Sequence, residues 1–101
     1  MTVPFQLSPS AVEDLNSIID YTIERFGEKQ AEKYIALLNE CAARLAMSNL
    51  VRIMPNTTPE VKFVKCQHHY VFGFQKEEQA FYILAILHEK MDLVRHIQMR
   101  M

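Results

Sequence analysis

Hydrophobic side chains fill an unbroken run near the end of the chain, residues 80–87, with the sequence AFYILAIL. The run is rich in aromatic and β-branched residues, and it is too short to cross a membrane. Such a run predicts a strand that is buried on both faces. Because neither face can be left to water, the rest of the chain must supply a neighbouring strand on each edge and a covering layer. We therefore expect residues 80–87 to form the central strand of a sheet.

Two segments with a helical period precede this run. Ser8 and Pro9 supply an N-cap and a proline at the first helical position, while Ser10 and Glu13 offer a capping box one register later. A helix begins here on either reading. Gly27 stands where the end of a helix requires a left-handed residue, and a second periodic segment follows at once. So short a connection predicts an antiparallel helical hairpin. The apolar stripes are Ala11, Leu15, Ile18, Ile19, Ile23 and Phe26 in the first helix, and Ala31, Tyr34, Ile35, Leu38, Cys41, Ala42, Leu45 and Ala46 in the second.

The other apolar segments are typical of strands separated by turn residues. The tail after residue 90 places apolar residues at helical steps, but so short a helix needs a surface on which to dock. The expected elements are a strand at residues 3–7, helices at 8–26 and 28–48, a loop at 54–60, strands at 61–66 and 69–75 joined by a turn at Gln67 and His68, a polar turn at 76–79, the buried strand, and one or two helical turns within 91–101.

This order of elements predicts an α+β fold, with an N-terminal strand and an antiparallel two-helix hairpin packed on a four-stranded, largely antiparallel sheet. The first strand is expected beside the last, and residues 1–101 form a single domain. In the strand at 69–75, Tyr70, Phe72 and Phe74 share one face. We expect one face of this strand to meet the core and the other to be at most half covered.

Composition narrows the function classes only slightly. The formal net charge is −1, which gives no sign of a strongly nucleic-acid-like chain. No secretion signal or apolar run of membrane-spanning length is present, so we expect a cytoplasmic protein without a membrane partner. In that setting Cys41 and Cys66 are interpreted as reduced, packed thiols rather than as a disulfide.

Few residues suggest catalysis or metal binding. Cys66, His68 and His69 are clustered but lack a fourth ligand nearby, which favours a packed thiol beside two solvent-facing histidines over a metal site. His88, at the end of the buried strand, is either an acid or base or a structural cap for residues 89–92. No phosphate loop, two-metal motif or nucleophile elbow is present, so no cofactor is expected. A basic surface would form if the tail returned across the strand at 61–66, and its members would be Lys62, Lys65, His68, Arg95, His96 and Arg100.

Three motifs resemble the RelE/ParE superfamily of toxins from bacterial toxin–antitoxin pairs, and in particular its ParE branch, also described as plasmid-stabilisation proteins. LSPSA at residues 7–11 resembles the opening of the family's first helix, with Asp14, Leu15, Ile18, Tyr21, Phe26, Gly27, Ala31 and Tyr34 at family spacing. YVFGF at 70–74 resembles a family strand, and ILAILHEKMD at 83–92 is similar to the ending typical of ParE-like members.

The resemblance implies a growth-inhibiting toxin that is neutralised by an antitoxin encoded alongside it. The ParE branch is associated with poisoning DNA gyrase, while the RelE branch cuts messenger RNA on the ribosome. RelE-like enzymes carry cations and a C-terminal tyrosine on the sheet face, and the tail of this chain has no tyrosine. We favour a non-enzymatic inhibitor, with a ribonuclease as the alternative. The residues expected to bind antitoxin or target are Tyr34, Tyr70, Phe72, His88, Met91, Asp92 and Arg95; those of the ribonuclease alternative are Lys62, Lys65, His88 and Arg95.

Overall fold

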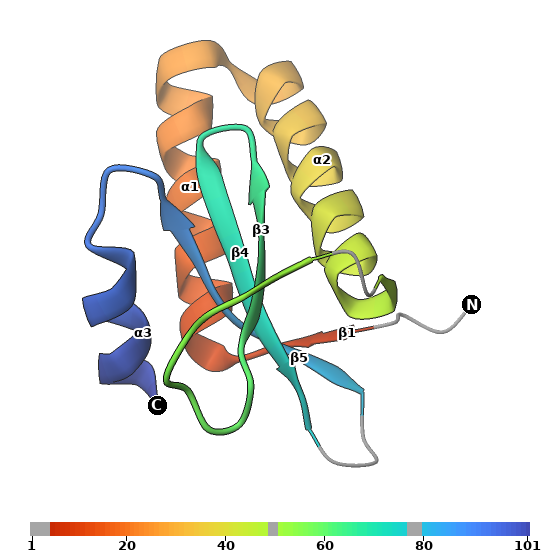
Figure 1. The fold of residues 1–101 in the computed structure, drawn as a ribbon. Helices are drawn as coiled ribbons and strands as arrows, with labels where there is room; N and C mark the ends of the chain where they lie inside the picture. The colour runs from red at the N-terminus through yellow and green to blue at the C-terminus, as the bar shows by residue number, and fades with distance from the viewer. Residues whose placement is uncertain (1–4, 49–50, 77–79) are drawn as a thin grey trace.

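A helical hairpin packs on one face of a mixed sheet in the computed structural model, which describes residues 5–48, 51–76 and 80–101 (Figure 1). The α+β class predicted from the sequence is confirmed. The elements are β1 (Phe5–Leu7), α1 (Pro9–Phe26), α2 (Glu28–Met47), β2 (Arg52–Ile53), β3 (Lys62–Cys66), β4 (His69–Gln75), β5 (Phe81–His88) and α3 (Leu93–Arg100). Parts of the predicted first strand and of the predicted turn at 76–79 lie outside the described residues.

The start of α1 follows the first of the two predicted capping patterns. The Ser8 hydroxyl accepts a hydrogen bond from the Ala11 amide at 3.0 Å and donates one to the Leu84 carbonyl at 3.0 Å. The first bond satisfies an amide that the first turn of a helix leaves unpaired, and the second ties that turn to β5. The N-terminus of α1 is thereby fixed to the sheet.

The hairpin turns at Gly27, whose φ of 88° and ψ of 169° fall in a region that glycine occupies almost alone. The positive φ is as predicted, but the residue is extended rather than left-handed helical. Its amide bonds to the Ile23 carbonyl that ends α1, and its carbonyl accepts from the Ala31 amide of α2. One glycine therefore closes one helix and opens the next.

The sheet has five strands in the order β1-β5-β4-β3-β2. β5 pairs in parallel with β1 and antiparallel with β4, so it has a neighbour on each edge, as predicted. The count of four strands is wrong, because β2 adds an edge strand antiparallel to β3. β2 has only two residues, and both are exposed, which leaves no hydrophobic alternation to detect.

A register shift at Phe72 and Gly73 lets β5 serve both faces of the sheet. Phe72 lies opposite Ala85, while Gly73 lies opposite Ile83, so Leu84 is an extra residue in β5. Gly73 is required here, because a Cβ at this position would lie 2.4 Å from a ring carbon of Phe81. The extra residue interrupts the alternation of β5 side chains between the two faces, so Leu84 and Ala85 both join the cluster on the α3 side.

Two buried clusters lie on opposite sides of the sheet, and both use β5. The hairpin face contains Ala11, Ile18, Leu38, Cys41, Ala42, Leu45, Cys66, Val71, Phe81, Ile83 and Ile86. The opposite face, under α3 and the segment between β2 and β3, contains Met54, Val61, Phe72, Leu84, Ala85, Leu87 and Ile97 (Figure 1). The expectation that one face of β4 would be at most half covered is wrong, because Val71 and Phe72 are both buried.

The prediction that Cys41 and Cys66 are reduced is also wrong, although both are buried as expected. Cys41 on the sheet-facing side of α2 and Cys66 at the end of β3 form a disulfide, with their Cα atoms 6.2 Å apart. That separation lies within the range that a disulfide spans. The expectation rested on the missing secretion signal, which concerns the surroundings of a protein and not the distance between two residues.

Candidate binding groove

A cleft of about 1340 Å³ opens between the Gly27 end of the helical hairpin and the ends of β4 and β5. We call it the hairpin groove. Four parts of the chain form its walls, which is a common setting for a binding site. The lining residues are Asp14, Ser17, Ile18, Tyr21, Thr22 and Phe26 of α1; Gln30, Lys33, Tyr34 and Leu37 of α2; Gln67, His68 and His69 at the β3–β4 turn; and Ile86, Leu87, His88, Glu89, Lys90 and Met91 at the end of β5.

Exposed apolar side chains form the rim of the hairpin groove. Phe26 is 67% exposed and Tyr21 56% exposed on α1, and Met91 is 39% exposed on the facing loop. Phe26 was predicted to lie on the buried stripe of its helix. The helix extends beyond the β3–β4 turn, however, so no strand of the described chain lies beneath the last turn of α1 (Figure 1). Large apolar residues gathered at a cleft are typical of a protein-binding surface.

Histidines from neighbouring strands form the floor. The Tyr34 hydroxyl and Nδ1 of His69 are hydrogen-bonded at 2.5 Å, and the ring of His69 meets the ring of His88 edge-on at 5.1 Å. Burial, together with the like charges that His88 and His68 would carry, lowers the pKa of His69 to about 4. Burial also raises the pKa of Tyr34. Both groups are therefore neutral near pH 7. The prediction that His69 faces solvent is wrong, because its side chain is partly buried.

Glu89 holds the β3–β4 turn against the end of β5. Its carboxylate lies 2.9 Å from Nδ1 of His68 and 3.1 Å from Nζ of Lys65, and its amide donates to the His68 carbonyl. The hydrogen bonds from His68 and Lys65 lower the pKa of Glu89 to about 2. The carboxylate is thus ionised and fully occupied by neighbours within the protein.

His88 braces the loop that follows β5. Its Nδ1 accepts a hydrogen bond from the Lys90 amide at 3.1 Å, and its carbonyl accepts from the Met91 amide at 3.0 Å. These contacts agree with the capping alternative for His88. They also fix Met91 at the rim of the hairpin groove.

In the hairpin groove the carboxylates are paired with cations, whereas two of the lysines have no ion pair among the residues that the structure describes. Glu89 is paired as above, and Asp14 accepts two hydrogen bonds from the Arg100 guanidinium at 2.6 and 2.9 Å. No ion pair is found for Lys33 or Lys90 within the described part of the chain. Two free ammonium groups therefore remain at a cleft whose carboxylates are already neutralised.

The predicted binding residues divide between two faces. Tyr34, His88 and Met91 line the hairpin groove. Tyr70 is half-buried on the other face, and Phe72 beside it is only 1% exposed, so Phe72 offers no open contact surface in this structure. The alternation of β4 could not reveal that α3 and the segment before β3 cover this ring.

The last two predicted residues belong to α3. The Asp92 carboxylate caps this helix by accepting from the Arg95 amide at 3.2 Å, and Arg95 is exposed on its first turn. The same capping geometry explains why the tail becomes a helix at Leu93.

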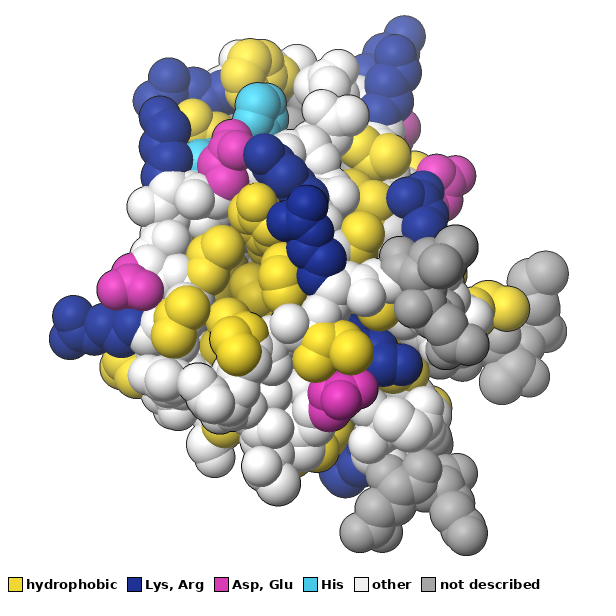
Figure 2. Space-filling view, viewed as in Figure 1, with side chains coloured by type: hydrophobic (Ala, Val, Ile, Leu, Met, Phe, Trp, Pro, Cys, Tyr) yellow, Lys and Arg dark blue, Asp and Glu magenta, His cyan; other side chains and the backbone are white. Residues whose placement is uncertain are grey.

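The predicted basic surface is divided: Lys65 and His68 lie together at Glu89, while other members lie elsewhere. Lys62 and Lys65 are three residues apart on β3 and therefore point to opposite faces of the sheet. Arg100 lies across β5, where it binds Asp14 and the Leu84 carbonyl. Figure 2 shows hydrophobic side chains in the middle of the face seen in Figure 1, with Lys and Arg side chains along one side of them. The four residues of the ribonuclease alternative are thus not all on one face of the sheet.

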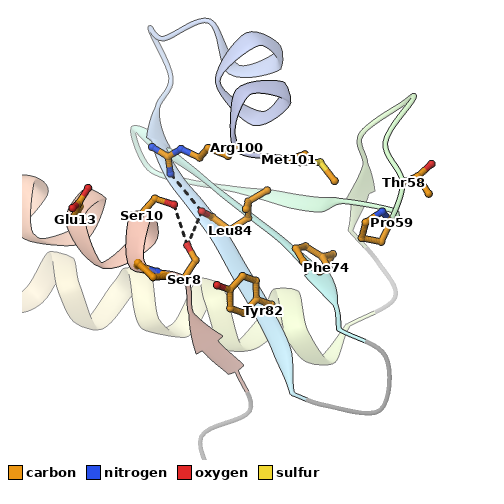
Figure 3. Close-up of a pocket in the computed structure, with 11 residues that line it drawn as sticks. Ser8, Ser10, Glu13, Thr58, Pro59, Phe74, Tyr82, Leu84, Arg100 and Met101 are labelled. Atoms are coloured by element: carbon orange, nitrogen blue, oxygen red, sulfur yellow. Dashed lines mark hydrogen bonds between the residues drawn. The ribbon is translucent and has the colours of Figure 1, made fainter.

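A smaller cavity of about 570 Å³ lies between the start of α1 and the end of α3 (Figure 3). Ser8, Leu84 and Arg100 form its inner wall and are already joined through the Leu84 carbonyl. The Ser8 hydroxyl and the Arg100 guanidinium thereby hold α1, β5 and α3 together. Among the described residues, no group of three or more His, Cys, Asp or Glu side chains could hold a metal ion, and no helix is long and apolar enough to cross a membrane.

Comparison with known proteins gives a consistent result. Residues 5–93 match the family model described as the ParE toxin of type II toxin–antitoxin system, parDE. The chain belongs to the ParE toxin family. It is 36% identical over 96 residues to Toxin ParE of Escherichia coli, covering 94% of this chain and 93% of that protein. Toxin ParE1 of Mycobacterium tuberculosis H37Rv is 29% identical over 98 residues, covering 96% of this chain and 100% of the relative.

A solved structure of similar shape is titled a chromosomal ParDE TA system from P. aeruginosa. It aligns with a TM-score of 0.69 at 20% sequence identity, covering 85% of this chain and 95% of that chain. At this identity the likeness supports the fold. The ParE family match ends at residue 93, the first residue of α3, so nearly all of this helix lies beyond it.

Proposed function

We propose that this ParE-family toxin acts in the cytoplasm, inhibits growth by binding and poisoning DNA gyrase, and is neutralised by an antitoxin that occupies the hairpin groove. The observation that carries the antitoxin part is the exposed apolar rim formed by Tyr21, Phe26 and Met91 at an open cleft. An amphipathic segment that buries these side chains would gain hydrophobic free energy, and it fits a groove of this size and shape.

The charges at the cleft specify the partner further. Because Lys33 and Lys90 lack ion pairs among the described residues, carboxylates on the partner would neutralise them without displacing an internal contact. The bound segment should therefore carry apolar residues on one face and acidic residues beside them.

Substitution of the rim tests the antitoxin part of the proposal. In Tyr21→Ser/Phe26→Ser the apolar rim is lost, and we expect the affinity for the antitoxin encoded beside this toxin to fall at least tenfold. Met47→Ser is the matched control, because Met47 is 78% exposed at the other end of α2. Equal affinities for the two variants would rule out the hairpin groove as the binding site.

The gyrase part rests on family membership and on the absence of a gathered catalytic set. Lys62 faces away from Lys65, the ammonium of Lys65 is engaged by Glu89, and Nδ1 of His88 is engaged by the Lys90 amide. General acid–base cleavage of RNA needs such groups to converge on one phosphate. Their separation favours a binding inhibitor over a ribonuclease.

Two assays performed side by side distinguish the candidates. We expect the purified toxin to slow gyrase-dependent supercoiling and to accumulate cleaved plasmid, without cutting messenger RNA in a translating extract. Ribosome-dependent cleavage that is lost in Lys65→Ala and Arg95→Ala would instead establish the ribonuclease. Lys29→Ala, an exposed lysine on α2, is the control for loss of charge alone.

A further inference from the structure

The Cys41–Cys66 disulfide joins the two layers of the molecule beside the hairpin groove. It links α2 to β3, and its two cysteines, 3% and 2% exposed, are the two that the chain contains. Nothing in the proposed gyrase or antitoxin contacts requires this bond. It is therefore a chemically reactive group without an assigned role.

Both ends of the bond are continuous with walls of the groove. Leu37 precedes Cys41 by four residues and lies on the same side of α2, one turn nearer the groove. Cys66 directly precedes Gln67 and lies opposite His69 in the pairing of β3 with β4. The bond thus fixes the distance between the helical wall and the floor.

The groove has a second link between the same walls, the hydrogen bond between Tyr34 and His69. Reduction of the disulfide would leave this bond and the apolar packing as the connections between α2 and the β3–β4 turn. The two walls would then be held by weaker contacts, and a partner would have to order them on binding.

We propose that Cys41 and Cys66 form a reversible thiol–disulfide site that sets how well ordered the hairpin groove is and, through that order, its affinity for a partner. This inference rests on the proposed function only where the partner is the antitoxin. The co-reactant is a small thiol such as glutathione, or its disulfide in the opposite direction.

The exchange is balanced as two successive displacements. A glutathione thiolate attacks one sulfur, forms a mixed disulfide with it, and releases the other cysteine as a thiolate. A second glutathione thiolate attacks the mixed disulfide, releasing the second cysteine and glutathione disulfide. Two electrons pass to the protein, whose two thiolates then take up protons.

Because both cysteines are buried, the rate of reduction depends on how tightly the walls of the groove are held together. A small thiol reaches them only when α2 and β3 separate locally. A partner that holds the two walls together should slow reduction and, because it binds the ordered walls better, should also shift the thiol–disulfide equilibrium toward the oxidised form. By linkage, the oxidised protein should then bind that partner more tightly.

Amide hydrogen exchange on the full chain tests the inference without assuming a partner. The oxidised protein, the protein reduced with glutathione and verified by mass, and the double variant Cys41→Ala/Cys66→Ala are compared. We expect faster exchange at residues 34–38 and 67–69 in the reduced and variant proteins, with little change at residues 11–18 of α1. Treating the double variant with glutathione should change nothing, which controls for the reductant.

Antitoxin affinity gives the second readout. We expect the antitoxin encoded beside this toxin to bind the reduced protein on the order of tenfold more weakly than the oxidised protein, because a less ordered site is less well prepared for binding. If the antitoxin binds neither form, the antitoxin proposal fails and hydrogen exchange still decides this inference. Equal exchange in the oxidised and reduced forms, or thiols that glutathione disulfide fails to oxidise, would overturn it.

Discussion

The two faces of the sheet are covered by very different amounts of structure. The hairpin face lies under two helices of 18 and 20 residues, which meet the sheet through most of their length. The opposite face lies under an eight-residue helix and the segment between β2 and β3. A short helix is marginal in isolation, so α3 depends on Ile97 and on the Arg100 ion pair for its place.

This difference separates stability from binding. The hairpin face carries the larger core and, where the hairpin outruns the sheet, leaves an open groove. The α3 face is covered in part by α3 and by the segment before β3, and hydrophobic side chains are visible in its middle (Figure 2). We expect α3 to be able to detach without unfolding the rest. Substitutions on the two faces should therefore differ in how far their effects spread.

The largest expected effect on stability comes from the cavities left when either of two equally buried isoleucines is replaced by alanine. Ile83 and Ile97 are both fully buried, one in β5 under the hairpin and the other in α3. Ile83→Ala should lower the free energy of unfolding by about 2 to 5 kcal/mol. Ile97→Ala should cost less, about 1 to 3 kcal/mol, because α3 can detach locally instead of opening the whole core. Urea denaturation measures both, and an equal cost with equal cooperativity would contradict the distinction between the faces.

A pair of glycine substitutions should give the next effect. In Gly73→Ala the new methyl would lie 2.4 Å from the Phe81 ring and 2.7 Å from the Tyr82 carbonyl, so β4 and β5 must move apart, at about 2 to 3 kcal/mol. In Gly27→Ala nothing lies within 4 Å, and the positive φ alone should cost about 1 to 2 kcal/mol. Thermal unfolding compares the two variants, and we expect Gly73→Ala to be the less stable. If Gly27→Ala were the less stable, the turn would be more critical than the close contact between the strands.

The ion pair at the end of α3 should have a smaller and local effect. Arg100→Ala leaves Asp14 with the Ile86 amide as its described partner and removes a link from α3 to α1, costing about 1 to 2 kcal/mol. Arg95→Ala, on the exposed side of the same helix, should change stability by less than about 0.5 kcal/mol. Hydrogen exchange should rise within α3 in the first variant and not in the hairpin. Faster exchange throughout the chain would mean that α3 is integral to the whole core.

The last effect appears only in acid, as a pH dependence from His69. Its pKa is lowered to about 4 from 6.5, so the unfolded chain takes up a proton on this side chain before the folded chain does. Stability should therefore fall as pH decreases from about 6.5 to about 4. His69→Asn keeps a hydrogen-bond acceptor for Tyr34 and should remove this part of the dependence. The part below about pH 4.5, which comes from Glu89 with its pKa near 2, should remain.

The sequence was sufficient for those features that local pattern determines. The apolar run at 80–87 required a strand with neighbours on both edges, and Ser8 with Pro9 located the start of α1. The sequence could not predict features that depend on how far one element extends over another. Phe26 continues the helical period of α1, yet it lies in the open because the sheet ends before the helix does.

Contacts between residues distant in the chain were also beyond sequence patterns. Arg100 and Asp14 are 86 residues apart, and nothing in either segment indicates their pairing. Cys41 and Cys66 were recognised as buried, but only the crossing of α2 over β3 brings them within bonding distance. Tyr34, His88 and Met91 were selected through the family resemblance. The geometry of the hairpin groove adds Tyr21, Phe26, Lys33 and Lys90.

The central claim is that the partner binds at the hairpin groove and not at the α3 face. Hydrogen exchange of the toxin, free and with the antitoxin encoded beside it, tests this claim most directly. We predict protection at residues 21–26, 34–37 and 88–91, with no change at Phe63 and Tyr70 on the opposite face. Protection confined to Phe63, Tyr70 and α3, with the hairpin groove unchanged, would contradict the account.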